Sequence, residues 1–300
     1  MRKNHKLIKN PGLIPSPPDP RDLLTSQIIP EIKRYPKECP QPFDLKVLDQ
    51  GNTPKCVAFS GATLKSYLEK KERKEVEFDP HWLYKKCKEI DGHPELRGTY
   101  LRALLKVLQK FGAKPLNGSE EEAKNYRISA YARIDNITFE ELKKHIFVYG
   151  IVFAGFMGSN EGWKAANLRP PKPGERIWGH AVDFTDYTKE RITVFNSWGE
   201  DWGDKGKGYV GPDYLPFEAW VVLVDYPTPE NQIIKEGWVA LPYLNLVKVG
   251  NIGKTLVNLN LRDEPNGKIL TTLKKGTRCQ LIEEPVAKGN FTWVKIRVKD

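Results

Sequence analysis

The sequence predicts an α+β protein whose main domain has two lobes and is followed by a small all-β unit. Two observations indicate this arrangement. Apolar residues recur at helical spacing through the first 150 residues, and short β-branched or aromatic segments bounded by Gly, Pro or Asp replace them afterwards. The change predicts a helical lobe and an antiparallel sheet lobe, with a cleft where the two lobes meet.

Four helices are expected in the first lobe. They begin at Cys56, at Asp79-Pro80, near Thr99 and at Thr138. Proline at a first helical position after aspartate is a typical start, and Thr138 with Glu141 three residues later forms a capping box. Glycines after the apolar stripes end the last two helices near residues 111 and 149. The strands expected in the second lobe are Ile151–Phe156, His180–Asp186, Arg191–Phe195, Gly208–Val210 and Trp220–Asp225.

Composition shifts divide the chain into three parts. Residues 1–43 hold nine of the 23 prolines, which predicts an extended arm laid on the surface, because proline lacks a backbone donor. Residues 44–228 form the main domain, and 226–235 read as a linker. Residues 229–300 alternate apolar and polar side chains between turns, as in a small all-β domain.

The composition excludes several classes of protein. A chain of 300 residues with 39% hydrophobic and 29% charged residues is too apolar to be disordered. Its longest apolar runs are too short to cross a membrane, and its start lacks the apolar stretch of a signal peptide, so a cytoplasmic location is expected. The four cysteines and five histidines show neither a disulfide framework nor zinc spacing, so no metal or other cofactor is expected.

The positive charge lies at the two ends of the chain. The net charge of +10 divides into +4 for residues 1–40, +1 for 41–228 and +5 for 229–300. A nucleic-acid enzyme should carry positive charge around its site, so no nucleic-acid partner is expected. The basic ends either contact an anionic wall polymer or acidic partner, or are simply solvated surface.

Three segments carry residues suited to nucleophilic catalysis: 49–60, 178–182 and 195–203. Cys56 lies where a loop enters a buried helix, whose positive end favours a thiolate. His180 heads a strand 124 residues later, within reach across a cleft, and Asn196 follows 16 residues further on. The asparagine can accept a hydrogen bond from the imidazole and select its tautomer, while Trp198 shields that bond from water.

Gln50 lies six residues before Cys56, and its amide together with the Cys56 N–H could form an oxyanion hole. Taken singly, each residue has a structural explanation: an inert buried cysteine, a core histidine, a turn asparagine or a loop glutamine. The four in this order, with Trp-Gly after the asparagine, are much harder to explain by packing.

Over residues 44–225 these motifs resemble the papain-like cysteine peptidases. The resemblance rests on Gln50, on Cys56 in Cys-Val-Ala-Phe-Ser, on Gly-His-Ala-Val, and on Asn-Ser-Trp-Gly followed by a Gly-rich stretch. It implies that Cys56 is the nucleophile, His180 the general base and acid, Asn196 its orienter and Gln50 an oxyanion donor. It also implies that the Gly98 backbone holds substrate and that Trp198 borders the substrate site.

Several positions depart from the family pattern. Pro54-Lys55 replaces the usual Gly-Ser, and Lys55 either favours the thiolate or is solvated away from it. Thr53 replaces a common cysteine, so the family disulfide is absent, which fits a reducing compartment. Asp183 stands where relatives have an apolar residue, and either is a buried paired acid or alters the cleft.

The two ends also carry resemblances. Residues 12–22 resemble the arm that precedes this domain in bacterial members; either the enzyme is made active, or the arm blocks the cleft. The C-terminal unit resembles a bacterial Src-homology-three type barrel, which implies a cell-wall or protein ligand, unless the unit binds nothing and only packs on the main domain. Trp293 fits either a core position or a ligand platform.

Together these features predict a thiol-dependent peptidase acting on protein or peptide substrates, with no nucleic-acid or membrane partner. Two alternatives stay open. One is a cell-wall hydrolase that cleaves peptidoglycan peptides and is targeted by the C-terminal barrel. The other is a catalytically silent binding protein on the same fold.

Overall fold

A computed structural model describes residues 12–28, 35–223, 234–247, 252–283 and 285–299 of the chain. The chain divides into two compact units. The main unit comprises residues 1–27 and 33–226, and the C-terminal unit comprises residues 28–32 and 227–300. Each has its own hydrophobic core, so each is described by itself.

The helices of the main unit follow the local signals in the sequence. They are α1 (Thr25–Ile28), α2 (Cys56–Lys71), α3 (Pro80–Ile90), α4 (Leu101–Lys110), the 3₁₀ turn η1 (Glu121–Tyr126) and α5 (Phe139–Tyr149). The Asp79 side chain accepts from two amides at the start of α3, and Thr138 accepts from Glu141 N–H at the start of α5. Gly150 ends α5 with a φ of 85°, a left-handed conformation that favours glycine.

The main unit contains a six-stranded antiparallel sheet in the order β1-β6-β2-β3-β4-β5. Its strands are β1 (Ala130–Arg133), β2 (Val152–Ser159), β3 (Ile177–Tyr187), β4 (Ile192–Phe195), β5 (Lys207–Val210) and β6 (Glu218–Leu223). β1 was not expected from the sequence. It has four residues and pairs with β6, so its formation depends on a distant partner and not on a local pattern.

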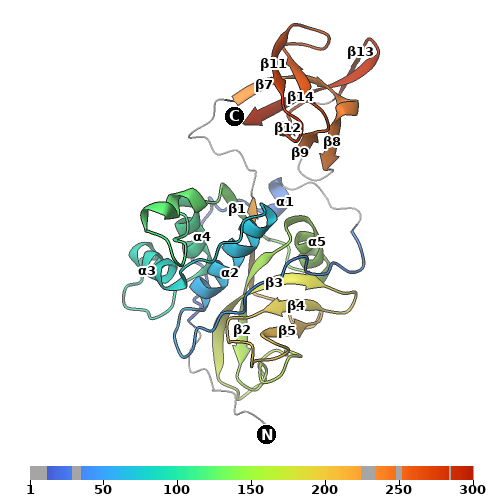
Figure 1. The fold of residues 1–300 in the computed structure, drawn as a ribbon. Helices are drawn as coiled ribbons and strands as arrows, with labels where there is room; N and C mark the ends of the chain where they lie inside the picture. Colours follow the sequence, from blue (N-terminus) through green and yellow to red (C-terminus); the bar gives the residue numbers. More distant parts are fainter. Residues whose placement is uncertain (1–11, 29–34, 224–233, 248–251, 284, 300) are drawn as a thin grey trace. The chain divides into compact units, whose positions relative to one another are not determined.

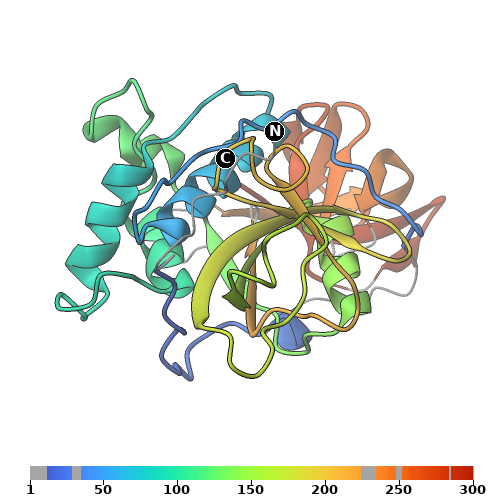
Figure 2. The ribbon, with the colours of Figure 1, turned by 90° about the horizontal axis from the view of Figure 1, so that it is seen from below.

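Helix α2 joins the two parts of the main unit. It packs against α3 and α4 on one side and against β2 and β3 on the other (Figure 1). Gly61 permits the approach to α4, because a Cβ there would lie 1.9 Å from a Leu104 methyl carbon. Seen from below, the helices α2–α4 gather beside the curved strands (Figure 2). Because α2 is buried along most of its length, its first residue is held against the sheet.

The C-terminal unit is an eight-stranded sheet in the order β11-β10-β7-β14-β12-β9-β8, with β13 pairing β14. Its elements are β7 (Ile234–Ala240), η2 (Leu241–Tyr243), β8 (Leu244–Val247), β9 (Ile252–Thr255), β10 (Leu259–Arg262), β11 (Ile269–Leu273), β12 (Arg278–Leu281), β13 (Val286–Lys288) and β14 (Phe291–Lys299). β7 begins inside the segment expected to be a linker. Trp293 is buried and donates to the Lys288 carbonyl at 3.0 Å, so it occupies a core position.

In the described ranges, no helix is long and apolar enough to cross a membrane. Among the same residues, no group of three His, Cys, Asp or Glu side chains is arranged to hold a metal ion. Cys39, Cys56, Cys87 and Cys279 are all free thiols.

Candidate active site

Cys56 is the first residue of α2 and is completely buried. Its sulfur accepts hydrogen bonds from the backbone N–H groups of Val57 and of Cys56 itself, at the positive end of the helix. It also accepts one from the N–H of Ala181 on β3. The sulfur therefore lies against the strand one residue beyond His180.

His180 and Asn196 are brought together by the β3–β4 pairing. His180 lies within β3, and Asn196 directly follows β4. Their side chains meet at 2.7 Å between Nε2 and Oδ1. Because an amide oxygen only accepts, Nε2 carries the proton and Nδ1 keeps its lone pair. Among the described residues, Nδ1 is buried and has no hydrogen-bond partner, so its lone pair is available to accept a proton.

Burial keeps both groups uncharged in this arrangement. It raises the pKa of the Cys56 thiol to about 12 and lowers the pKa of His180 to about 4, because neither charged form is solvated. The N–H donors at the sulfur and the Asn196 oxygen oppose these shifts without reversing them. The structure therefore favours a neutral thiol and imidazole here, whereas the sequence led us to expect an ion pair.

Gln50 is tied to the segment that carries Asn196. Its backbone N–H donates to the Ser197 carbonyl at 2.9 Å, and its side-chain Oε1 accepts from the Ser197 hydroxyl at 2.8 Å. Its Nε2 donates to the Thr53 carbonyl at 2.7 Å. Ser197 N–H in turn donates to Asn196 Oδ1 at 2.8 Å. One hydrogen-bonded chain thus links Gln50 to the histidine.

Aromatic rings cover the imidazole. The ring of Trp198 lies 4.6 Å from that of His180, centroid to centroid, at an interplanar angle of 34°. Trp163 and Trp178 contact the imidazole edge-on at 5.5 and 6.0 Å. These indoles exclude water from the bond between His180 and Asn196, as the sequence suggested for Trp198.

Two odd positions in the motif now have a structural explanation. Lys55 turns away from the sulfur: its Nζ lies 3.0 Å from His81 Nδ1 and 5.3 Å from the centre of the Tyr84 ring. Asp183 is buried, and its Oδ2 accepts from the Ser60 hydroxyl at 2.8 Å. Burial raises the pKa of Asp183 well above its ordinary value, and the bond to Ser60 places this acid against α2.

The N-terminal arm crosses the site instead of lying only on the surface. Leu13 is buried in the same cluster as Cys56 and Ala181. Its N–H donates to the Gly179 carbonyl at 3.1 Å, while Thr99 N–H donates to the Gly12 carbonyl and Ile14 N–H to the Thr99 carbonyl, each at 3.0 Å. The arm thus pairs with the backbone on both sides of the site, which explains why the expected cleft is closed.

Glycines make this close approach possible. A Cβ on Gly98 would lie 2.0 Å from the Gly12 oxygen, and one on Gly179 would lie 2.3 Å from the Leu13 oxygen. Gly12 itself has a φ of 98°, and a Cβ there would lie 2.2 Å from the Pro54 oxygen. Gly98, expected to hold substrate, is therefore covered by the arm.

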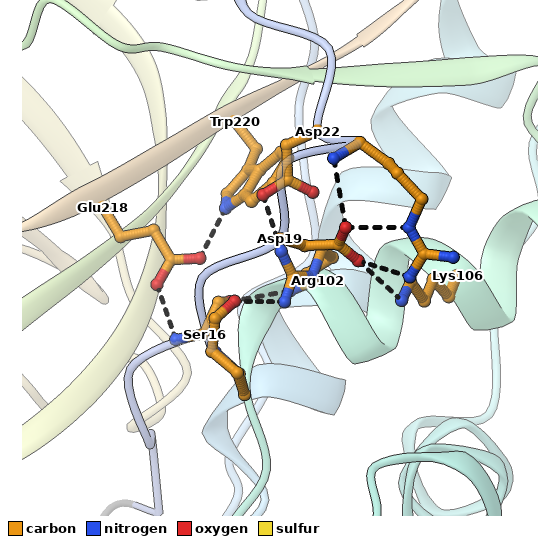
Figure 3. Close-up of polar contacts among 9 residues, drawn as sticks. Ser16, Asp19, Asp22, Arg102, Lys106, Glu218 and Trp220 are labelled. Carbon is orange, nitrogen blue, oxygen red and sulfur yellow. Dashed lines mark hydrogen bonds and ion pairs between the residues drawn. The ribbon is translucent and has the colours of Figure 1, made fainter.

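A charged cluster fastens the next part of the arm (Figure 3). Arg102 of α4 pairs with Asp22 at 2.6 Å, both side chains being almost fully buried, and also donates to the Pro17 carbonyl. Lys106 lies 3.7 Å from Asp19. On the sheet side, Glu218 accepts from Ser16 N–H at 3.0 Å. Sequence reasoning missed Arg102 and Glu218, because each reads locally as a helix or strand boundary residue.

No model of a known protein family matches the sequence, and no curated protein matches it. Several solved structures are similar to this chain. Xylellain, a cysteine protease from Xylella fastidiosa, is 22% identical, with a TM-score of 0.62 over 75% of this chain and 100% of that one. A digestive procathepsin L2 proteinase from Tenebrio molitor larval midgut is 17% identical (TM-score 0.56; 71% of this chain, 78% of that one).

A cysteine protease from Carica candamarcensis, solved in complex with E-64, is 15% identical, with a TM-score of 0.53 over 64% of this chain and 100% of that one. Identities this low establish the fold and not the activity. The chain has the papain-like cysteine protease fold, with a helical part and an antiparallel sheet.

Proposed function

We propose that the chain is a cysteine peptidase that hydrolyses peptide bonds through a Cys56–His180–Asn196 triad. The observation that carries this proposal is the orientation of His180. Asn196 holds Nε2 at 2.7 Å, and Nδ1 is left without a partner next to the strand position whose N–H contacts the Cys56 sulfur. His145 also has one buried ring nitrogen without a partner among the described residues, and what distinguishes His180 is its place next to the strand position whose N–H contacts the Cys56 sulfur.

The reaction would begin when a peptide replaces the arm. The Cys56 proton passes to His180 Nδ1, and the sulfur attacks the peptide carbonyl carbon to form a C–S bond. The oxygen takes the negative charge and is stabilised by the Cys56 N–H and the Gln50 amide. The C–N bond then breaks as His180 returns its proton to the amine, which leaves as the first product.

Water completes the cycle. His180 Nδ1 takes a proton from a water molecule whose oxygen attacks the thioester carbon, and the C–S bond breaks. The carboxylic acid leaves, and the proton on His180 restores the thiol. Asn196 keeps the ring oriented throughout by accepting from Nε2.

The test is digestion of a peptide library by the full chain, with the Cys56→Ala variant alongside. We expect cleavage by the native chain, abolished in Cys56→Ala, and covalent labelling of Cys56 by an epoxide thiol reagent seen as a mass increase. Labelling without cleavage of any peptide would favour a silent binding protein. Cleavage of purified cell walls but not of casein would favour a wall hydrolase.

A further inference from the structure

The loop between α3 and α4, residues 91–100, carries backbone groups that face the candidate site. It has no regular secondary structure, and a single-residue bridge pairs Thr99 with Leu13 of the arm. The Thr99 N–H donates to the Gly12 carbonyl, and the Thr99 carbonyl accepts from the Ile14 N–H, each at 3.0 Å. A peptide that displaces the arm breaks these bonds. The loop must therefore keep its shape through contacts of its own if it is to bind the backbone of that peptide.

Lys88, in the last turn of α3, supplies such contacts. Its ammonium group donates to the Asp91 carboxylate at 2.8 Å, to the His93 carbonyl at 2.6 Å and to the Gly98 carbonyl at 3.0 Å. An ammonium has three N–H groups, and here three acceptors of the same loop surround it. The Asp91 side chain is buried, and its second oxygen accepts from the His93 N–H at 3.0 Å. One cation therefore joins the beginning, the middle and the end of the loop.

The bond to the Gly98 carbonyl fixes the direction of the donor that faces the arm. The Gly98 carbonyl and the Thr99 N–H belong to one peptide group, which is planar and trans. In a trans peptide group the C=O and the N–H point in opposite directions. Lys88 thus holds the oxygen on one side, while the Thr99 N–H points to the Gly12 carbonyl on the other. Because linked hydrogen bonds polarise one another, the ammonium also makes this N–H a stronger donor.

We propose that Lys88 is a positioning residue, which holds the Gly98–Thr99 peptide group in the orientation that binds the backbone of a substrate. This rests on the proposed peptidase function. A carbonyl of the substrate takes the place of the Gly12 carbonyl, and an N–H of the substrate takes the place of the Ile14 N–H. Lys88 acts through the Gly98 carbonyl and not by contact with the substrate. It should therefore lower KM and leave kcat unchanged, because these bonds form on binding and take no part in the bond changes of the reaction.

The competing explanation is that Lys88 only neutralises the buried Asp91 carboxylate. Removing the lysine alone would then lower stability, because a buried carboxylate without its cation is costly. Removing both charges, with Lys88→Met and Asp91→Asn together, would restore stability and, on this explanation, substrate binding as well. On our proposal the double variant regains stability but still lacks the bond to the Gly98 carbonyl.

The first test uses the full chain with Gly12→Ala, which loosens the arm by the contact with Pro54. A cleaved peptide is compared with analogues in which each amide in turn is an ester, which lacks the N–H and has a weaker carbonyl acceptor. Both compete with the same arm, so the ratio of their KM values reports the backbone bonds of the substrate. At one position away from the cleaved bond, we expect the ester to raise KM about fivefold or more and to change kcat by less than about twofold.

The variants show whether this ratio depends on Lys88. Lys88→Met should reduce it to below about twofold, and so should the double variant with Asp91→Asn. Lys86→Met is the matched control: Lys86 lies on the same helix, its side chain is 19% exposed against 18% for Lys88, and it pairs with Glu89 of α3 at 2.9 Å. It should preserve the ratio. A ratio that Lys88→Met leaves unchanged, or that the double variant restores, would overturn the proposal.

The second test does not depend on catalysis. In the Cys56→Ala chain the arm takes the place of the substrate, and hydrogen exchange followed by NMR measures how often the Thr99 N–H opens. We expect Lys88→Met and the double variant to speed this exchange about tenfold or more, and Lys86→Met to leave it unchanged. Unchanged exchange in the Lys88 variants would overturn the proposal even in an active peptidase. Faster exchange in a chain that cleaves no peptide would refute the peptidase function and leave the positioning of the Thr99 N–H standing.

Discussion

At the scale of single residues, the main feature is that Cys56 and His180, the proposed nucleophile and base, are both buried and kept neutral. The helix start, the Ala181 amide and the Asn196 oxygen are all in place. Burial outweighs them, because no water reaches either group. The groups that would stabilise a thiolate and an imidazolium are therefore present, but neither charged form is solvated.

This predicts how Cys56 alkylation depends on pH. Only the thiolate reacts, and its fraction falls about tenfold for each pH unit below the pKa. With the pKa at about 12, alkylation of the native chain by iodoacetamide should be slow at pH 7 and rise steadily through alkaline pH. Loosening the arm with Gly12→Ala should move the profile to lower pH. Adding His180→Ala should move it back, and a profile unchanged by Gly12→Ala would contradict the role given to burial.

The residues of the proposed triad could be singled out from the sequence because each lies in a short motif with a fixed neighbour. Cys56 begins a helix, and His180 and Asn196 flank a hairpin, so local spacing suffices. Arg102 and Glu218 were not predictable, because their importance comes from contacts with the arm, which lies 80 or more residues away along the chain. The sequence also did not reveal that Cys56 and His180 are neutral, since their charge depends on how the site is covered.

At the scale of elements, the arm covers the candidate site. Its backbone bonds to Gly179 and Thr99, and its side chains bind Arg102 and Lys106. A peptide substrate would need the same backbone positions. The second of the two explanations raised by the sequence, an arm that blocks the site, is therefore the one we propose.

Gly12→Ala tests the arm directly. The added carbon would lie 2.2 Å from the Pro54 oxygen, so the arm must shift, and we expect peptidase activity to rise severalfold or more. Gly174→Ala is the matched control: it also has a positive φ, of 86°, but no heavy atom lies within 4 Å of its added carbon. Initial rates on a fluorogenic peptide give the comparison. Equal rates for native and Gly12→Ala chains would show that the arm does not limit activity.

Prediction of elements from the sequence succeeded where the signal was local. The capped helices α3 and α5 begin where Asp79 and Thr138 indicated. Strand β1 was not predicted, because four residues carry too little periodicity. The burial of the arm was not predicted either, because proline content indicates an extended chain but not whether that chain is buried. Leu13 is a buried apolar anchor in the arm that the pattern did not single out.

At the scale of the whole molecule, the two units have separate cores. The main core surrounds α2, and the C-terminal core is built from β-strand side chains such as Val294 and Ile296. A Src-homology-three type domain that binds a wall or protein ligand stays a prediction for the second unit.

Separate cores predict two unfolding transitions in calorimetry. Trp293→Ala removes a side chain that is 4% exposed, and a truncation of this kind costs about 3–5 kcal/mol. We expect it to lower only one transition, while Leu104→Ala in the main core lowers only the other. A single transition shifted by both variants would mean that the units unfold as one.

The indoles packed around His180 give the molecule a built-in optical reporter. The ring of Trp198 lies 4.6 Å from the imidazole at an interplanar angle of 34°, and within 6 Å of Trp163, Trp178 and Trp202. A protonated imidazole quenches the light that a neighbouring indole emits, and water reaching the rings shifts that light to longer wavelength. Intrinsic emission should therefore follow, without any added dye, each departure of the arm and each proton gained by His180.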